Sequence, residues 1–303
     1  MPSESEATMN CSVAVPAGKP IYFYHSFPRL PHQSDHALGL KILDSILEKG
    51  LLLTAELQTF PACRGLNAGE FIQQRVCFTA LTTDQLPDHA KAFGSFSLEF
   101  DCKVLRNFGV LPAVYFSGRL PNGEIFNEAG GMLARHLLEA HNVLKDLWIL
   151  HDCGADEKKK LAKAVLDEIH PSKIPIQTLH FTLQALLNLY YPTDDPERTG
   201  PLHYYQQREW KIVPNLSYGG QWHYPPPTPE EATKLLQINP DFFAKVIQGK
   251  PRVEQCSFFT VDGKNLVDFV RRIIVPDAVL DDARQIVATR ARAIEVTPAT
   301  IVK

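Results

Sequence analysis

Several features that mark large classes of protein are missing from the sequence. No apolar run approaches the roughly 20 residues that a membrane-spanning helix needs. A formal net charge of -3 over 303 residues gives no sign of a polyphosphate-binding protein. The six cysteines are scattered, and no two have the C-x-x-C spacing of a zinc or redox site. We therefore expect a cytoplasmic protein with reduced thiols, without a bound metal and without contact to a membrane.

Sequence motifs of the common catalytic sites are missing as well. The chain has no G-x-S-x-G nucleophile elbow, no G-x-x-x-x-G-K-[ST] phosphate loop and no H-E-x-x-H zinc motif. Cys77 has no charged residue directly beside it to stabilise a thiolate, so it is a poor candidate for a nucleophile. Any active site must therefore be built from carboxylates, histidines and aromatic residues that are spread along the chain.

What remains is the composition of an ordinary globular protein, with 45% hydrophobic and 21% charged residues. Residues 1–19 are polar and carry no signal pattern, so we expect a disordered leader there. Residues 20–303 mix short strands and helices without an internal repeat or a linker, which predicts a single α+β domain. Helical periodicity dominates residues 122–191, which predicts a helical insertion in this domain.

Hydrophobic periodicity also places individual elements. Apolar residues at helical spacing from His36 to Lys49 predict a helix, and Leu51–Thr54 is interpreted as a short extension of it. Alternation predicts strands over Pro20–Ser26, Arg75–Ala80 and Ser95–Asp101. Near the C-terminus we predict helices over 229–236, 240–248 and 277–292 and strands over 256–260 and 267–275.

The stretch His203–Pro214 (HYYQQREWKIVP) carries the strongest candidate for a catalytic group. It follows a turn-rich run and alternates as a strand, with Arg208 and Trp210 on one face and Glu209 and Lys211 on the other. Glu209 is thus a carboxylate on a strand among aromatic residues, where an acid can be held rigidly against a substrate. The alternative is a solvent-facing glutamate on an edge strand, paired with Lys211 or Arg208.

Other residues can contribute to a ligand site. His25 lies near the end of an aromatic strand beside Ser26, where an imidazole can donate a hydrogen bond to a ribose or phosphate oxygen. Phe78 and Thr79 can offer a ring and a hydroxyl at the end of the next strand. His89 lies on a helix and points either into a cleft or into solvent. The alternative for each is a structural role, in the core or at the surface.

Taken together, these stretches resemble a bacterial family, the AbiGi-type abortive phage resistance proteins. That family carries a C-F…H…Y-G block, which is similar to the run from Val76 through His89 to Tyr115. It also carries a y-y-x-x-R-E-W-R-x-v-P block, which is similar to Tyr204–Pro214. The resemblance covers roughly Tyr22 to Val275 and implies a cytoplasmic phage-defence protein of a toxin–antitoxin type of system.

The family in turn resembles the ADP-ribosyltransferase fold, a mixed sheet core in which a strand-end His or Arg, a middle aromatic or Ser and a late Glu line the NAD cleft. By order along the chain, this resemblance implies that NAD is a substrate and that Glu209 is the catalytic residue. The implied contacts are the adenosine ribose with His25 and the nicotinamide ring with Phe78 or Tyr24. The residues implied to bind NAD are Tyr24, His25, Ser26, Phe78, Thr79, His89 and Arg208.

Two hypotheses about function stay open. The first is an NAD-dependent ADP-ribosyltransferase or NAD glycohydrolase, whose acceptor is protein, nucleic acid or water. The second is a non-enzymatic, antitoxin-like module on a degenerate transferase fold, which binds a protein partner from a defence operon. A transferase should hold His25 and Glu209 in one cleft, on adjacent strands. A partner-binding module should show a large exposed apolar patch.

Overall fold

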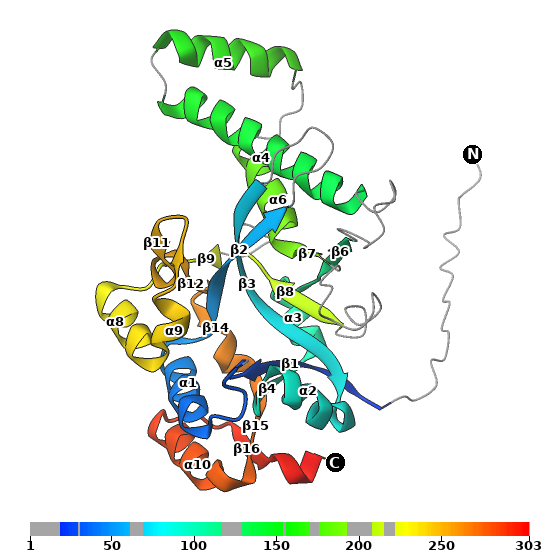
Figure 1. Cartoon of the computed structure of the whole chain (residues 1–303), viewed down its shortest axis with the longest axis vertical. Coiled ribbons are helices and arrows are strands. Elements are labelled where there is room, and N and C mark those ends of the chain that lie inside the picture. Colours follow the sequence, from blue (N-terminus) through cyan, green and yellow to red (C-terminus); the bar gives the residue numbers. More distant parts are fainter. Residues whose placement is uncertain are drawn as a thin grey trace, which may run out of the picture.

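The computed structural model of the chain describes residues 19–29, 31–60, 69–116, 129–153, 156–169, 176–192, 208–214 and 222–302. These residues form a curled mixed sheet with helices around it, and a group of three helices projects from one end of the sheet (Figure 1). The predicted α+β class is therefore confirmed. The predicted disordered leader lies almost entirely outside the described residues.

The main sheet has nine described strands. Its order is β12-β2-β3-β1-β4-β15-β16, with β8 also paired to β3 and β5 paired to β8. The β15–β16 pair is parallel and the other pairs of this sheet are antiparallel. The strands are β1 (Ile21–Phe27), β2 (Leu52–Phe60), β3 (Gly69–Thr82), β4 (Phe96–Asp101), β5 (Leu111–Pro112), β8 (Glu209–Ile212), β12 (Ser257–Phe258), β15 (Val270–Val275) and β16 (Glu295–Pro298).

Smaller elements surround this sheet. The short strands are β6 (Val114–Phe116), β7 (Tyr190–Pro192), β9 (Trp222–His223), β10 (Val246–Ile247), β11 (Lys250–Pro251), β13 (Thr260–Val261) and β14 (Lys264–Asn265). The helices outside the group of three are α1 (His36–Lys49), α2 (Leu86–Phe93), α3 (Cys102–Asn107), α8 (Pro229–Ile238), α9 (Pro240–Phe243) and α10 (Leu280–Thr289). The helix predicted over 240–248 is thus shorter than expected, because its C-terminal part turns into the β10–β11 hairpin.

The main hydrophobic core lies between the sheet and two helices. Leu43 and Leu47 of α1 and Val287 of α10 pack against Phe100 of β4 and Phe23 of β1. All five are almost fully buried. The core therefore combines residues from both ends of the described chain, which the spacing of apolar residues alone does not reveal.

The interpretation of Leu51–Thr54 as a helical extension is wrong. Gly50 ends α1 with a φ of 100°, a backbone conformation that favours glycine. The chain then enters β2, which forms a long antiparallel pair with β3 from Thr54↔Arg75 to Phe60↔Gly69. Polar residues such as Glu56 and Gln73 occupy this pair and hide the alternation of a strand.

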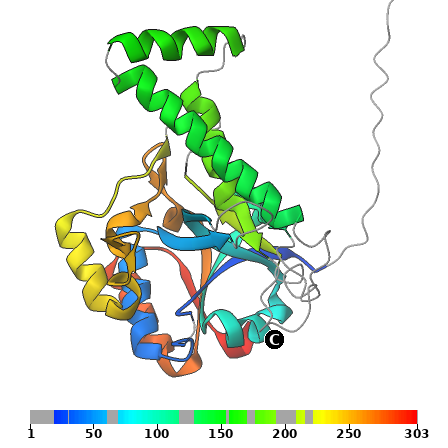
Figure 2. The same cartoon turned by 45° about the horizontal axis from the view of Figure 1, so that its top comes forward.

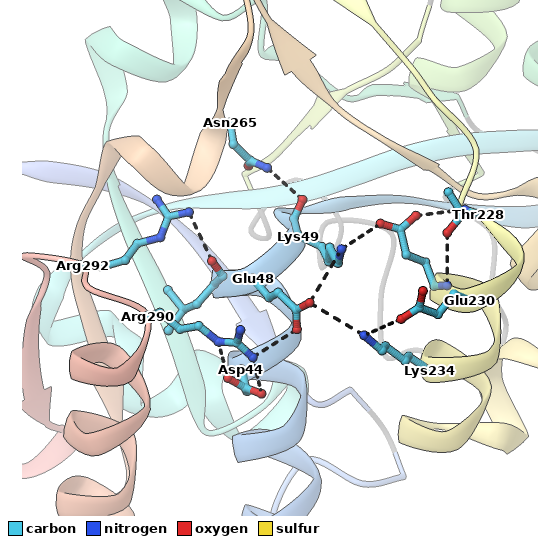
Figure 3. Close-up of polar contacts among 11 residues, drawn as sticks. Asp44, Glu48, Lys49, Thr228, Glu230, Lys234, Asn265, Arg290 and Arg292 are labelled. Atoms are coloured by element: carbon cyan, nitrogen blue, oxygen red, sulfur yellow. Dashed lines mark hydrogen bonds and ion pairs between the residues drawn. The ribbon is translucent and has the colours of Figure 1, made fainter.

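Ion pairs hold α1 in place on both of its sides (Figure 3). Arg290, directly after α10, donates to Asp44 through Nε and Nη2, both at 2.8 Å. On the other side, Lys49 pairs with Glu231 of α8 at 3.1 Å, and Asn265 Nδ2 donates to the Lys49 carbonyl at 2.9 Å. Each exposed ion pair contributes less than about 1 kcal/mol to the free energy of unfolding. Together they fix the position of α1 between α8 and α10.

The group of three helices is named the helical arm and consists of α4 (Ala129–Cys153), α5 (Asp156–Ile169) and α6 (Ile176–Leu189). Two buried side chains connect its α6 to the sheet. Gln73 of β3 donates to the carbonyls of Leu187 and Tyr190 at 2.7 and 2.8 Å. Lys211 of β8 donates to the carbonyls of Leu189 and Tyr190 at 3.4 and 3.1 Å. A cation at the C-terminus of a helix is favourable because the last carbonyls carry partial negative charge.

Candidate functional site

The strands that carry the predicted site residues meet along β3. Thr79 of β3 pairs with Tyr24 of β1 and also with Glu209 of β8. A residue in a sheet has one neighbour on each side, so β1 and β8 lie on opposite edges of β3. His25 and Glu209 therefore come from strands that are separated by β3.

The two side chains also lie on opposite faces of the sheet. Directly paired residues share a face, which places Glu209 with Thr79 and Tyr24. His25 is one residue further along β1, and its ring lies 5.9 Å from the ring of Phe78 on the other face. The prediction that His25 and Glu209 line one cleft from adjacent strands is therefore wrong. The order of motifs along the chain does not show that β3 lies between them.

A pocket of about 480 Å³ opens where β1 and β2 separate along β3. β3 pairs with β1 at residues 79–82 and with β2 at residues 69–75. The stretch Val76–Phe78 of β3 therefore pairs with neither β1 nor β2, although it pairs with β8. His25–Arg29, the first half of β2, Arg75–Cys77 and parts of α1, α8 and α9 line the pocket. Of the predicted site residues, His25 and Ser26 line it and Glu209 does not.

His25 is held in its neutral form at the edge of this pocket. Its Nδ1 lies 2.9 Å from the Cys77 carbonyl oxygen, which β1 leaves unpaired as it moves away from β3. Burial lowers the pKa of His25 to about 4, and the nearby Arg29 adds to this although the bond to Cys77 opposes it. The neutral ring therefore donates from Nδ1 to Cys77, and its Nε2 carries no proton.

Acidification is expected to destabilise the protein through His25. Its pKa is about 4 in the folded protein and 6.5 ordinarily, so the unfolded chain takes up the proton first. The stabilisation is complete above about pH 6.5 and is lost as the pH falls toward about 4, on the order of 2–3 kcal/mol at most. Urea unfolding across this pH range would measure the loss. His25→Asn keeps a donor for the Cys77 carbonyl but does not titrate, and it should show a shallower dependence. The same dependence in both proteins would contradict this role.

Six charged side chains line the pocket: Arg29, Glu56, Arg75, Asp241, Lys245 and Arg252. Arg75 Nη2 donates to Glu56 Oε2 in a close ion pair. Burial opposes the ionisation of Glu56, but the guanidinium groups of Arg75 and Arg29 outweigh it and hold its pKa below the ordinary value. The guanidinium of Arg252 lies 4.1 Å from the centre of the Phe242 ring, and among the described residues its buried Nε has no hydrogen-bond partner. The pocket thus offers positive charge together with aromatic surface.

Glu209 is buried, with an exposed fraction of 9%, so the alternative of a solvent-facing glutamate is wrong. Its backbone N–H donates to the Tyr115 hydroxyl at 3.2 Å, and its Oε2 has no hydrogen-bond partner in the described part of the chain. Protein atoms around the guanidinium oppose the charge of Arg29, but the carboxylates of Glu56 and Glu209 outweigh them and raise the pKa of Arg29, although the residue as a whole is exposed. Arg29, an exposed residue of the pocket lining, therefore lies close enough to Glu209 to interact with its charge.

The two rings expected to stack on nicotinamide have no open face. Tyr24 is fully buried, and its hydroxyl donates to Glu99 Oε2 at 2.8 Å. Phe78 is fully buried against Phe100, with ring centres 5.5 Å apart. Thr79 is buried beside Glu209. These residues support the site from within the sheet.

The remaining predicted residues surround the site. Ser26 lines the pocket, and its hydroxyl lies 2.8 Å from that of Ser97. His89 of α2 is half-buried and stacked on Phe93 at 4.4 Å between ring centres. Burial and then the charge of Arg29 lower the pKa of His89 to about 4. Arg208 is exposed, precedes β8 and does not line the pocket.

The sequence analysis missed most of the charged groups in the pocket. Arg29 follows His25 closely and could have been found as the cation after the strand-end motif H-S-F-P-R. Glu56 and Arg75 were hidden because the β2–β3 pair was not recognised. Arg252 lies far along the chain, in a short helical turn after β11, and no sequence signal connects it to the others.

Comparison with known proteins identifies no relative: no protein-family model, no curated protein and no solved structure matches the chain. The resemblance to the abortive phage resistance family and to the ADP-ribosyltransferase fold therefore stays a prediction. In the described ranges, no helix has the length and apolar character needed to cross a bilayer.

Proposed function

We propose that the chain is a phage-defence protein that binds NAD, or a closely related dinucleotide, in the pocket between β1 and β2. The observation that carries this proposal is the combination of arginine side chains and aromatic rings in one pocket of about 480 Å³. Guanidinium groups bind phosphate oxygens through two parallel hydrogen bonds, and rings stack on the bases. The volume lies in the range of pockets that bury small organic ligands.

The residues present fit an anionic ligand with two ends. Near β1, the exposed Arg29 and the neutral His25 offer a cation and an imidazole. Near α9, Arg252 keeps an unpartnered buried Nε beside Phe242. A dinucleotide carries a charged pyrophosphate and two ring systems, and cations and aromatic rings are the groups that bind them. The role in phage defence rests on the sequence resemblance alone.

Replacing Arg29 by alanine tests the binding. Arg29 is exposed, so its removal should leave the fold intact while it removes a charge-assisted contact. We expect NAD affinity, measured by isothermal titration calorimetry, to fall at least about tenfold, as for the loss of one hydrogen bond to a charged group. Arg284→Ala, which removes an exposed arginine of α10 far from the pocket lining, is the matched control and should bind as the wild type does.

Fragments of the ligand make the result specific. Titration with ADP-ribose and with nicotinamide separates the contribution of the phosphates from that of the base. ADP-ribose should compete with NAD, and its binding should depend on Arg29, whereas nicotinamide alone should bind weakly. If wild-type protein binds neither NAD nor ADP-ribose, the pocket is not a dinucleotide site and the proposal fails.

Cleavage of NAD is the second candidate function, and the buried Glu209 favours it. The bond between the nicotinamide nitrogen and C1′ of the ribose breaks, and its electron pair leaves with nicotinamide. Water or another acceptor then adds at C1′ and releases a proton. A carboxylate with a free oxygen, as in Glu209, can stabilise the positive charge that builds on the ribose. Because Glu209 does not line the pocket, the ribose would have to extend past Arg29 to reach it.

A further inference from the structure

One face of α4 in the helical arm carries an apolar stripe that the rest of the described chain leaves open. Its positions follow the alternating three-and-four spacing of a coiled-coil seam. We name these residues the α4 seam: the apolar Leu133, Ala140, Val143, Leu147 and Leu150, with the polar His136 at one of its positions. A stripe with this spacing on a helix surface is the pattern that packs against another helix.

The α4 seam faces away from the body of the protein. Ala134 and Leu138 lie on the opposite side of α4 and are buried in a cluster with α6 and β3. Within the seam, Leu133 is 46% exposed and Val143 is 57% exposed. In Figure 2, α4 is the long green helix that crosses α6, with α5 above it. The helix therefore has two apolar sides: one packs on α6 and β3, whereas the seam on the other side stays exposed except for the half-buried Leu147, although α5 also packs on α4.

The spacing also sets the length of the exposed face. From Leu133 to Leu150 the seam is about 25 Å long at the rise of an α-helix. A single exposed leucine is common on a protein surface, whereas a regular seam of this length is a feature of interaction surfaces. The occupant that fits it is another amphipathic helix.

The charge along the seam indicates which kind of helix. Glu139 and Asp146 lie seven residues apart along one edge of the seam, and both are exposed. Glu139 is paired with Arg135 at 2.6 Å, and Asp146 has no ion-pair partner in the described ranges. A second copy packed antiparallel would bring Glu139 of one copy near Asp146 of the other, and like charges oppose such pairing. The acidic edge therefore disfavours self-association and suits a basic partner.

We propose that the α4 seam is a docking site for an amphipathic helix of another protein, whose apolar seam is flanked by lysine or arginine. This inference goes beyond dinucleotide binding and does not depend on it, because the seam lies on the helical arm and none of its residues lines the pocket. The apolar seam supplies most of the affinity. The acidic edge of the seam sets the choice of a basic partner.

The test uses a designed peptide of about 20 residues, long enough to form a helix, with leucines at the seam spacing and lysines along the edge that faces Glu139 and Asp146. The control peptide has glutamates in place of the lysines. Binding of the fluorescein-labelled peptides to the full chain is measured by anisotropy at low and high salt. We expect the lysine peptide to bind up to about fivefold tighter, as for one exposed ion pair with Asp146, and the difference to shrink at high salt.

Variants assign the binding to the seam. Val143→Asp should lower the affinity for the lysine peptide at least about tenfold, because it places a charge in the apolar centre of the seam. Leu161→Asp changes a leucine of α5 that is 67% exposed and outside the seam, and it should have no effect. Asp146→Lys should reduce or reverse the preference for the lysine peptide.

Three results would overturn the proposal. One is the absence of binding by either peptide, and another is equal binding by both at low salt. The third is sedimentation equilibrium that shows a dimer of the wild type which Val143→Asp abolishes, since the seam would then be covered by a second copy.

Discussion

Glu209→Gln is expected to lower the rate of NAD cleavage by about a hundredfold or more if the chain cleaves NAD, while the dissociation constant for NAD changes little. Glutamine keeps the shape of the side chain but removes the charge that stabilises the cationic ribose in the transition state. Binding should persist, because Arg29 and Arg252 of the pocket are unchanged. Nicotinamide release by wild type and variant measures the effect.

Two controls make this result interpretable. Thermal unfolding is needed because Glu209 is buried near Lys211 and interacts with its charge. Burial and then the charge of Arg75 lower the pKa of Lys211 to about 8, whereas Glu209 acts to raise it. Glu230→Gln removes a carboxylate that is 80% exposed on α8 and should leave turnover unchanged. Equal turnover in wild type and Glu209→Gln would remove Glu209 from the mechanism. Binding of NAD without any turnover in wild type would favour the non-enzymatic module.

Gly94→Ala is expected to destabilise the protein by about 3 kcal/mol or more. Gly94 ends α2 with a φ of 116°, which residues with a side chain rarely adopt. A Cβ there would lie 2.3 Å from the Phe27 carbonyl carbon and 2.5 Å from the Pro28 oxygen. Because these are backbone atoms, the end of β1 would have to move. Phe27 and Pro28 line the pocket, so NAD affinity should fall together with stability.

The matched control for this substitution is Gly249→Ala. Gly249 also has a positive φ, at 79°, but an added Cβ would meet nothing within 4 Å. Gly249→Ala should therefore lower the free energy of unfolding by only about 1 kcal/mol, the cost of a positive φ for alanine, and should not change NAD affinity. Urea unfolding gives both free energies. Similar values for the two variants would show that contact with β1 is not the cause.

Local sequence patterns predicted the elements whose stability depends on near neighbours. The helix predicted over His36–Lys49 is confirmed with its exact bounds, because Asp35 caps its first turn and Gly50 ends it. The strand predicted over Ser95–Asp101 is confirmed within one residue, since alternation is regular there. The β2–β3 pair was not predicted, because it buries the polar Gln73, whose hydrogen-bond partners are carbonyls of α6 and β7 far along the chain.

The candidate site was less predictable than the fold. The burial of Glu209 agrees with its expected place on a strand, but the sequence does not show that β3 separates it from His25. The pocket depends on where β1 and β2 leave each other along β3, which is a property of strand pairing. Arg252 reaches it from a segment that is far from His25 along the chain and close to it only after folding.

The order of strands in the sheet has a consequence for how the chain is made on the ribosome. β4 lies between β1 and β15, and β2 pairs with β12, so two strands of the N-terminal half await partners that are synthesised near the end. Until then, β4 presents an open edge of large apolar residues such as Phe100. Such an edge pairs readily with other chains. We therefore expect the nascent chain to be prone to aggregation until its last strands are synthesised.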